Sequence, residues 1–361
     1  MKILVTGGAG FVGSNLSTSL AARHPDWGLV ALDNLRRRGS ELNLSRLREA
    51  GVEFVHGDVR EGSDLDAIGS VDAVVECSAE PSVLSERSGG ARYVVESNLI
   101  GAWNCIELAV AHGAQLIFLS TSRVYPLEAL RSLQLEEGPD RFELADEQPL
   151  PGASAAGIAE GFPLQGPRTL YGTTKLSAEL LIAEYRESGG LRAAVDRCGV
   201  IAGPWQMGKV DQGVFTYWML SHLLGRPLSY IGYGGSGRQV RDLLHVEDLV
   251  DLIEDQLVRP DVWDGATVNV GGGREVSLSL AEATTLCREI SGLEVEIGSE
   301  PQERPGDVPL YISDCGAAER IGGWAPKRSA RDVLEDVHRW AREHRDVLEE
   351  ALAGADRGTE P

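Results

Sequence analysis

Tyr171 and Lys175 are the residues whose types and spacing most directly suggest catalysis. They form a Tyr-x-x-x-Lys pair, and on a helix this spacing places both side chains on one face. A phenol with a pKa of about 10 is a poor base at neutral pH, but a neighbouring ammonium group favours its ionised form. The pair therefore predicts a general base, Tyr171, tuned by Lys175.

A hydroxyl group for the reacting oxygen can come from Ser120-Thr121-Ser122, which ends a predicted strand. Ligands bind at this edge of parallel sheets. A Tyr/Lys pair alone is common on helix surfaces. Because this pair comes after a strand-end hydroxyl and the glycine motif described next in chain order, the combination indicates a catalytic group.

A glycine cluster, Thr6-Gly7-Gly8-Ala9-Gly10-Phe11-Val12-Gly13, lies between a predicted strand and a predicted helix. Gly7, Gly10 and Gly13 fit a G-x-x-G-x-x-G spacing. Glycine permits the tight turn and leaves room for a pyrophosphate, which backbone N–H groups and the helix N-terminus can bind. The cluster predicts a dinucleotide site.

The choice of dinucleotide depends on Asp33, at the end of the second predicted strand. A carboxylate here accepts hydrogen bonds from the adenosine ribose hydroxyls and repels a 2′-phosphate, which favours NAD over NADP. The basic run Arg36-Arg37-Arg38 is the argument for NADP, but we favour the interpretation that it forms a solvated loop with some substrate-side charge. Asp58 follows the third strand and is placed to meet the adenine amino group or simply to form a turn.

These residues require a parallel sheet with helices on both faces, and the first two hundred residues alternate accordingly. We predict an α/β protein with a Rossmann-type doubly wound parallel sheet and a smaller C-terminal α/β substrate-binding region. The predicted strands are Ile3–Thr6, Leu29–Asp33, Glu53–His56, Ala73–Glu76, Leu116–Ser120 and Ala193–Arg197. The predicted helices are Ser14–Arg23, Asn98–His112, Thr173–Glu187, Val214–Leu224, Val246–Leu257, Ser279–Ser291 and Ala330–Arg342.

Three segments follow from this pattern. Residues 1–200 form the NAD-binding domain, with an inserted loop at 126–170 that we place on the substrate side because Phe142, Phe162 and Leu164 can anchor it. Residues 201–342 form mainly the nucleotide-sugar-binding region. Residues 343–361 contain a helix end and a tail expected to fray.

Composition restricts the partners and the compartment. The 34 basic and 55 acidic residues give a net charge of −21, which argues against nucleic acid or anionic lipid as a partner. The five cysteines are widely spaced without a CxxC pair, so we predict no metal site and a reducing, cytoplasmic environment. No apolar run approaches the length of a membrane span or a signal sequence.

Taken together, the motifs resemble the extended short-chain dehydrogenase/reductases that act on nucleotide sugars, over roughly residues 1–340. Asn98-Leu99-Ile100-Gly101-Ala102-Trp103-Asn104 also resembles the N-x-x-G-x-x-N helix of that family. Within the family the sequence is most similar to the 2-epimerases of CDP-sugars, on segments that include Asp33-Asn34-Leu35, Asp211-Gln212-Gly213, Asn269-Val270-Gly271-Gly272 and residues 52–60 and 239–245.

The resemblance implies a bound NAD that oxidises a sugar hydroxyl and returns the hydride to the opposite face of a keto intermediate. Thr121, Tyr171 and Lys175 would be catalytic. Further cofactor contacts would be Phe11, Val12, Asn34, Val59, Ser78, Ala79, Asn98 and Cys198. It also implies a homodimer that pairs through the helices at 98–112 and 173–187.

The substrate of such an enzyme is a nucleoside-diphosphate sugar, whose anionic diphosphate requires local positive charge. Arg241 and Arg304 are the best candidates because a planar guanidinium binds phosphate bidentately. Arg123, Gln206 and Gln212 complete the predicted substrate site.

Departures from the family pattern narrow the chemistry. Ser122 and Arg123 stand where related dehydratases and decarboxylases have acidic groups, and arginine stays protonated, so both chemistries are disfavoured. Glu76 and Glu80 lie where relatives have His-Leu-Ala, and either carboxylate could reshape the sugar pocket or point outward. Epimerisation at C2 or C4, a net oxidoreductase and a non-catalytic NAD(H) sensor remain open.

Overall fold

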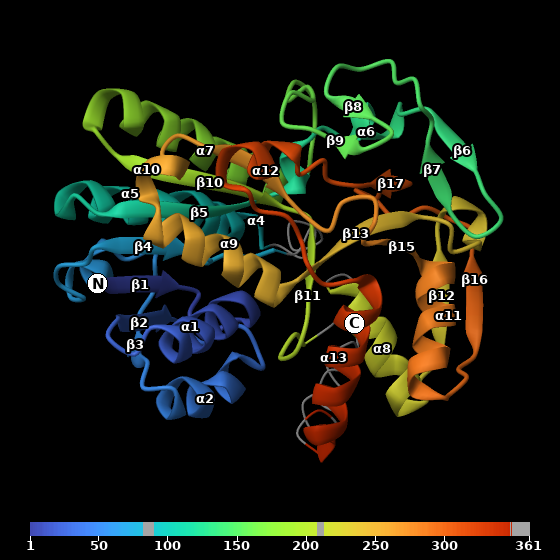
Figure 1. The fold of residues 1–361 in the computed structure, drawn as a ribbon, viewed down its shortest axis with the longest axis horizontal. Helices are drawn as coiled ribbons and strands as arrows, with labels where there is room; N and C mark the ends of the chain where they lie inside the picture. Colours follow the sequence, from blue (N-terminus) through green and yellow to red (C-terminus); the bar gives the residue numbers. More distant parts are fainter. Residues whose placement is uncertain (82–89, 208–212, 347, 349–361) are drawn as a thin grey trace.

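A seven-stranded, fully parallel sheet forms the framework of this computed structural model, which describes residues 1–81, 90–207, 213–346 and 348 (Figure 1). The strand order is β14-β10-β5-β4-β1-β2-β3. The strands are β1 (Lys2–Thr6), β2 (Gly28–Asp33), β3 (Glu53–His56), β4 (Ala73–Glu76), β5 (Gln115–Thr121), β10 (Arg192–Cys198) and β14 (Thr267–Val270). The predicted fold class is confirmed, since all six predicted strands are present with ends shifted by one residue at most.

The seventh strand, β14, comes from the second half of the chain and pairs with β10 along its length. Its Val268 and Val270 are completely buried. The segment is short and contains a polar Asn269, so its local pattern alone does not identify a sheet strand. The sheet thus includes residues beyond 200.

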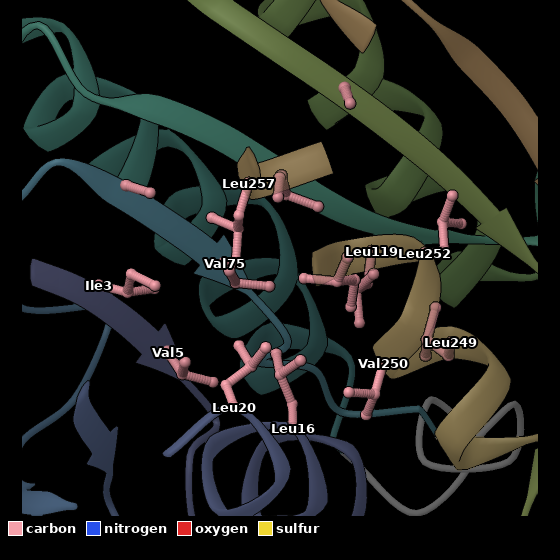
Figure 2. Packing of buried hydrophobic residues seen from close by; sticks show 14 of the residues in the cluster. Ile3, Val5, Leu16, Leu20, Val75, Leu119, Leu249, Val250, Leu252 and Leu257 are labelled. Carbon is pink, nitrogen blue, oxygen red and sulfur yellow. The ribbon is translucent and has the colours of Figure 1, made fainter. Parts of the chain in front are cut away.

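Helices cover both faces of this sheet because alternate strand residues point to opposite sides and both sets are apolar. The helices α1 (Phe11–Arg23) and α9 (Val246–Val258) pack on one face, and α5 (Gly101–His112) and α7 (Leu170–Gly189) on the other. Figure 2 shows the first of these layers, in which side chains of α1 and α9 meet those of β1, β4 and β5.

The strand order reverses between β1 and β4, which lie side by side although two strands separate them in sequence. In open parallel sheets, the crevice outside the carboxyl ends of the strands at such a reversal is the usual place for a ligand. Gly7, Asp33 and Cys77 follow or end three of the strands around this point.

The C-terminal half builds a second layer of small sheets and helices (Figure 1). The strands β11, β13, β15 and β17 form one sheet, and β12 and β16 form another. Their bounds are β11 (Val200–Ala202), β12 (Leu228–Ile231), β13 (Val240–His245), β15 (Ser277–Ser279), β16 (Ile297–Glu300) and β17 (Leu310–Tyr311). The helices α8 (Val214–Leu224), α11 (Leu280–Ser291) and α13 (Ala330–Glu343) pack around a core of their own, close to their predicted bounds.

The inserted segment 126–170 is folded. It contains α6 (Leu127–Arg131) and the short strand pairs β6 (Leu135–Glu137) with β7 (Phe142–Leu144) and β8 (Ala153–Ser154) with β9 (Gly157–Ile158). Phe162 is buried in its core, and Phe142 and Leu164 pack against that core, as the anchoring prediction required. The segment bonds to the C-terminal half through Ile158, whose N–H donates to Ile312 at 2.8 Å.

Shorter elements complete the fold. They are α2 (Leu44–Glu49), α3 (Gly62–Asp66), α4 (Ala91–Val95), α10 (Pro260–Trp263), α12 (Gly316–Gly322), the 3₁₀ turns Ser40–Asn43, Ser122–Val124 and Tyr233–Gly235, and a π-helical turn, Glu96–Ile100. Within the described ranges, no helix has both the length and the apolar character needed to cross a bilayer.

Candidate active site

A cavity of about 740 Å³ lies at the carboxyl ends of the parallel strands, around the reversal of strand order. Most residues predicted from the sequence line it. These are Gly7, Gly10, Phe11, Val12, Gly13, Asp33, Asn34, Asp58, Val59, Ser78, Ala79, Thr121, Arg123, Tyr171, Lys175, Cys198 and Gln206. The predicted residues Asn98, Arg241 and Arg304 are not part of this lining, and Gln212 lies outside the described residues.

The glycine cluster forms one end of the cavity and has no space for side chains. Gly7 has a φ of +61°, and a Cβ on Gly13 would lie only 2.3 Å from the carbonyl oxygen of Gly7. The helix α1 begins directly afterwards, with Gly10 as N-cap and no acidic residue in its first turn. The positive end of α1 therefore faces the cavity with no acidic side chain in its first turn, which suits a pyrophosphate.

Asp33 lies at the end of β2, beside the glycine cluster. Its carboxylate accepts hydrogen bonds from the backbone N–H groups of Ala9, at 3.1 Å, and Leu35, at 2.8 Å. Burial raises the pKa of Asp33 despite these bonds. The carboxylate is thus fixed in orientation at the place where the sequence requires an acceptor for ribose hydroxyls.

Charged groups surround the end of the cavity beside Asp33. Asp58 accepts hydrogen bonds from Arg60, at 2.7 Å, and from Asn34, at 2.9 Å. Burial opposes ionisation of Asp58, but these bonds outweigh it and lower its pKa to about 2. Arg36 lies over the ring of Tyr93, with 3.9 Å between its guanidinium carbon and the ring centroid. Arg37 and Arg38 also line the cavity.

The N-x-x-G-x-x-N segment, residues 98–104, contacts two chain segments that line the cavity. Asn98 donates to the carbonyl oxygen of Glu80 at 3.2 Å and accepts from its N–H at 2.8 Å, which fixes the loop carrying Ser78 and Ala79. Asn104 donates to the carbonyl oxygen of Val59 at 2.8 Å, and a Cβ on Gly101 would collide with the side chain of Val59. Asn98 therefore acts in this structure by holding a loop that lines the cavity.

Tyr171 is the second residue of α7, a helix that begins against the turn after β5. Thr169 caps the helix by accepting from the N–H of Gly172 at 3.2 Å. A Cβ on Gly172 would lie 2.0 Å from the carbonyl oxygen of Arg123, so only glycine allows this approach. The close contact brings Tyr171 to Thr121 at the strand end, near enough for the hydroxyl group of Thr121 to lower the pKa of the phenol.

The ionisation of Tyr171 depends on its neighbours. Burial raises the pKa of the phenol, whereas the ammonium group of Lys175 and the hydrogen bond with Thr121 lower it. Thr121 also accepts from the N–H of Arg123 at 3.2 Å, which fixes its side chain. The Tyr/Lys pair and the strand-end hydroxyl, predicted from separate segments, are adjacent in the folded chain.

Lys175 is buried and forms an ion pair with Glu76, with 3.0 Å between Nζ and Oε2. The side chains of Lys175 and Glu76 are only 2% and 1% exposed, respectively. Glu76 ends β4 and is buried, so of the two alternatives left open by the sequence it does not take the outward one. Sequence spacing gives no sign of this contact, which joins residues 99 positions apart.

A buried polar network supports Thr121 and α7. Glu179, one turn beyond Lys175, pairs with Arg197 of β10 at 2.7 Å and accepts a hydrogen bond from Ser120. Arg197 donates to the hydroxyl oxygen of Tyr125 at 3.3 Å, and Tyr125 donates to Asn269 of β14 at 2.7 Å. The network links β5, α7, β10 and β14 directly beneath the catalytic edge.

The predicted substrate residues divide into two groups. Arg123 and Gln206 line the cavity, and Arg123 donates to the carbonyl oxygen of Gly306 at 2.8 Å. Arg241 lies close enough to Arg123 to lower its pKa further, after burial. Arg241 pairs with Asp307 at 2.6 Å, in the same segment as Arg304.

Two residues near the glycine cluster were not predicted from the sequence. Asn43 lines the cavity and donates to the carbonyl oxygen of Ala9 at 2.9 Å. Arg46 donates to Asn43 at 2.8 Å and to Asn15 at 2.9 Å, and burial lowers its pKa to about 10. The two residues brace the glycine cluster. Their spacing along α2 and the preceding turn carries no signal of this role.

Comparison with known proteins agrees with this geometry. Residues 3–271 match the model of the NAD dependent epimerase/dehydratase family. The CDP-paratose 2-epimerase of Salmonella typhi is 28% identical over 350 residues, covering 94% of this chain and 99% of that protein. A dTDP-glucose 4,6-dehydratase of Mycobacterium tuberculosis is 27% identical over 360 residues, covering 97% and 98%.

Among solved structures, the UDP-glucose 4-epimerase of Thermotoga maritima with UDP-glucose is 26% identical, has a TM-score of 0.76 and covers 95% of this chain and 99% of that one. The UDP-glucose 4-epimerase of Thermus thermophilus in complex with NAD is 25% identical, has a TM-score of 0.74 and covers 95% and 99%. The family model spans most of the chain, and the glycine cluster, Asp33 and Tyr171 line one cavity. This protein therefore belongs to the NAD dependent epimerase/dehydratase family.

Proposed function

We propose that this protein is a nucleotide-sugar epimerase that works through a transient keto-sugar, similar to the CDP-paratose 2-epimerases. One observation carries the proposal: Thr121, Tyr171 and Lys175 line the same cavity as a glycine cradle with no room for side chains. A protein that only senses NAD(H) needs no such proton path. The Salmonella typhi 2-epimerase and the 4,6-dehydratases are similarly identical to this chain, so the choice of epimerisation over dehydration rests on Ser122 and Arg123.

The cavity fits NAD at three points. The N–H groups of the glycine cluster and the start of α1 would hold the pyrophosphate, and Asp33 would accept from the adenosine ribose. Lys175 would donate to the hydroxyls of the nicotinamide ribose, because an ammonium group has three donors and Glu76 accepts only one at close range. When bound, NAD supplies an acceptor and donor of hydride.

Tyr171 moves the proton in this proposal. In its ionised form, which Lys175 and Thr121 favour against the effect of burial, it accepts the proton of a sugar hydroxyl group while the carbon bearing that group loses its hydride, which produces a ketone. Thr121 donates a hydrogen bond to the developing carbonyl oxygen. After the keto-sugar turns over, Tyr171 returns the proton to the oxygen, and the configuration at the carbon is inverted.

The residue type at position 123 argues against a dehydratase activity. Elimination of water needs an acid and a base beside the strand-end hydroxyl, but Ser122 and Arg123 occupy those positions here. A guanidinium group cannot exchange protons near neutral pH. Arg123 instead contributes positive charge to the sugar side of the cavity together with nearby Arg241, which suits the diphosphate of a nucleotide sugar.

The test is to incubate the pure protein, without added cofactor, with CDP-, UDP-, GDP- and dTDP-sugars and to follow the products by proton NMR. We expect one of these to yield a new diastereomer, and the inverted proton signal then distinguishes C2 from C4. Stoichiometric consumption of added NADH would instead indicate a net oxidoreductase. No turnover of any nucleotide sugar would contradict the proposal.

We also propose that two copies pair through α5 and α7. These helices lie side by side, with Trp103 donating to the hydroxyl oxygen of Tyr185 at 2.9 Å. Their outer face exposes large apolar side chains, with Trp103 42% and Leu180 65% exposed. An apolar helical face of this kind favours burial against a second copy.

A further inference from the structure

Glu76 is a buried carboxylate on the floor of the site to which the proposed reaction gives no role. It ends β4 and lies between Thr6 of β1 and Phe118 of β5 in the sheet register. Its Oε2 lies 3.0 Å from Lys175 Nζ, and its Oε1 is buried without a hydrogen-bond partner. A buried carboxylate lowers the free energy of unfolding unless it is paired with an opposite charge.

Lys175 has no other anionic partner close to its ammonium group within the described residues. Its Nζ lies 3.5 Å from the carbonyl oxygen of Ser78 and 4.4 Å from the centroid of the Phe118 ring. Both contacts attract a cation but neither carries a net charge. The positive charge of Lys175 is therefore balanced by Glu76.

We propose that Glu76 is a positioning residue that keeps the buried side chain of Lys175 charged and directed at the cavity, and that this charge makes Tyr171 an effective base. The catalytic part of this inference rests on the proposed function. The electrostatic part concerns the resting protein and can be tested without a substrate.

The balance of effects on Lys175 supports this role. Burial lowers the pKa of Lys175, but the charge of Glu76, which is the largest opposing influence, together with Tyr171 and the hydrogen bond to Glu76, raises it. The other titratable groups around the pair are the phenol of Tyr171 and the thiols of Cys77, Cys105 and Cys198. Burial raises the pKa of each of them, so they are neutral at neutral pH.

Removing the charge of Glu76 has two opposite consequences for Tyr171. Loss of the carboxylate itself lowers the pKa of the phenol, but loss of the proton from an unpaired, buried Lys175 raises it. We expect the second effect to dominate, because burial is the largest influence on Lys175 and nothing anionic replaces Glu76.

The first experiment measures thermal unfolding of the purified protein, saturated with NAD, from pH 7 to pH 10. Glu76→Gln is nearly isosteric and should lower the melting temperature by roughly 5 °C at pH 7, since it leaves Lys175 unpaired. A lysine with a depressed pKa in the folded state destabilises the fold below that pKa, and the penalty disappears as pH rises toward its unfolded value. The deficit should therefore shrink toward pH 10.

Glu179→Gln is the matched control, because Glu179 lies one turn later on α7 and also forms a buried ion pair. Its partner Arg197 stays charged across this range, so the deficit should not shrink with pH. Adding Lys175→Met to Glu76→Gln should recover most of the stability lost at pH 7, because it removes the unpaired charge. A pH-independent deficit in Glu76→Gln, or no recovery in the double variant, would overturn the inference.

The second experiment uses the epimerisation assay. In Glu76→Gln the acid limb of the kcat profile should move to higher pH by about one unit, with kcat at pH 7 reduced about tenfold. Glu76→Asp should recover part of kcat, because it restores the charge. An unchanged acid limb, or one moved to lower pH, refutes the catalytic part. Absence of all epimerase activity in the wild-type protein refutes the proposed function and leaves the unfolding result as the test of the charge balance.

Discussion

Arg241 and Asp307 form an ion pair, with 2.6 Å between Nη2 and Oδ1, close to the buried guanidinium group of Arg123. Arg241 also donates to the carbonyl oxygens of Val240 and Val308, both at 2.7 Å, so three acceptors hold its guanidinium group. A planar guanidinium group suits a diphosphate because it can donate two parallel hydrogen bonds, which is the role proposed for Arg241.

We predict that Arg241→Ala weakens binding of the nucleotide sugar and barely affects the chemical step. KM should rise roughly 30-fold and kcat should change by less than about threefold, because the diphosphate is remote from the reacting carbon. Steady-state kinetics measure both values. Arg274→Ala, which removes a charge from a solvent-facing arginine paired with Glu143, is the control and should leave KM unchanged. A fall in kcat alone would assign Arg241 to another role.

Tyr171→Phe should reduce kcat by about a thousandfold, because the variant loses the phenol beside Thr121 that is proposed to exchange a proton with the substrate. NAD should still bind with unchanged affinity, since the cradle and Asp33 are intact, which a fluorescence titration can measure. Tyr217→Phe is the matched control on α8, away from the cavity lining. Activity within about tenfold of the wild type in Tyr171→Phe would show that another group moves the proton.

The main elements of the site were predictable because each depends on a local signal. The glycine cluster, Asp33 at a strand end and the i, i+4 spacing of Tyr171 and Lys175 all reflect short-range geometry, and the structure brings them to one cavity. Lys175 and Glu76 meet only because α7 crosses the end of β4 in the folded chain. Likewise, Asn98 fits a cofactor motif in sequence. Its contact with Glu80 depends on how the turn Glu96–Ile100 packs against the loop that follows β4.

Asp33→Ser should change the preference for the cofactor. Removing the carboxylate takes away the acceptor for the ribose hydroxyls, and Arg36, Arg37 and Arg38 already line this end of the cavity. We expect NAD affinity to fall at least about tenfold and NADP affinity to rise. Isothermal titration with both dinucleotides measures the ratio. A variant that loses NAD without gaining NADP would show that these arginines do not reach the 2′ position.

Asp196 links stability to pH. It is completely buried on β10, accepts from Gln256 at 2.8 Å, and its second carboxylate oxygen has no partner. Burial raises its pKa from 3.8 to about 7. The folded state thus holds a proton that the unfolded chain releases between these values, so this residue makes stability fall as pH rises through that window.

Asp196→Asn should therefore stabilise the protein at pH 8 by up to about 4 kcal/mol, and the gain should vanish near pH 4. Urea unfolding at several pH values tests this. Asp66→Asn, at the exposed end of α3, is the control and should show no such trend. A gain independent of pH would mean that packing, not ionisation, explains the effect.

The proposed pairing of two copies can be tested on α7, where Leu180 is 65% exposed. Leu180→Glu should place a charge in the centre of the apolar face and reduce the mass measured by light scattering from twice 38.8 kDa to 38.8 kDa. Val258→Glu at the end of α9, where the side chain is 56% exposed, makes the same change on a different surface and should not alter the mass. Because α7 also carries Tyr171 and Lys175, loss of the partner should loosen the helix and lower kcat at low protein concentration. If Leu180→Glu keeps the larger mass, the copies associate through a different face.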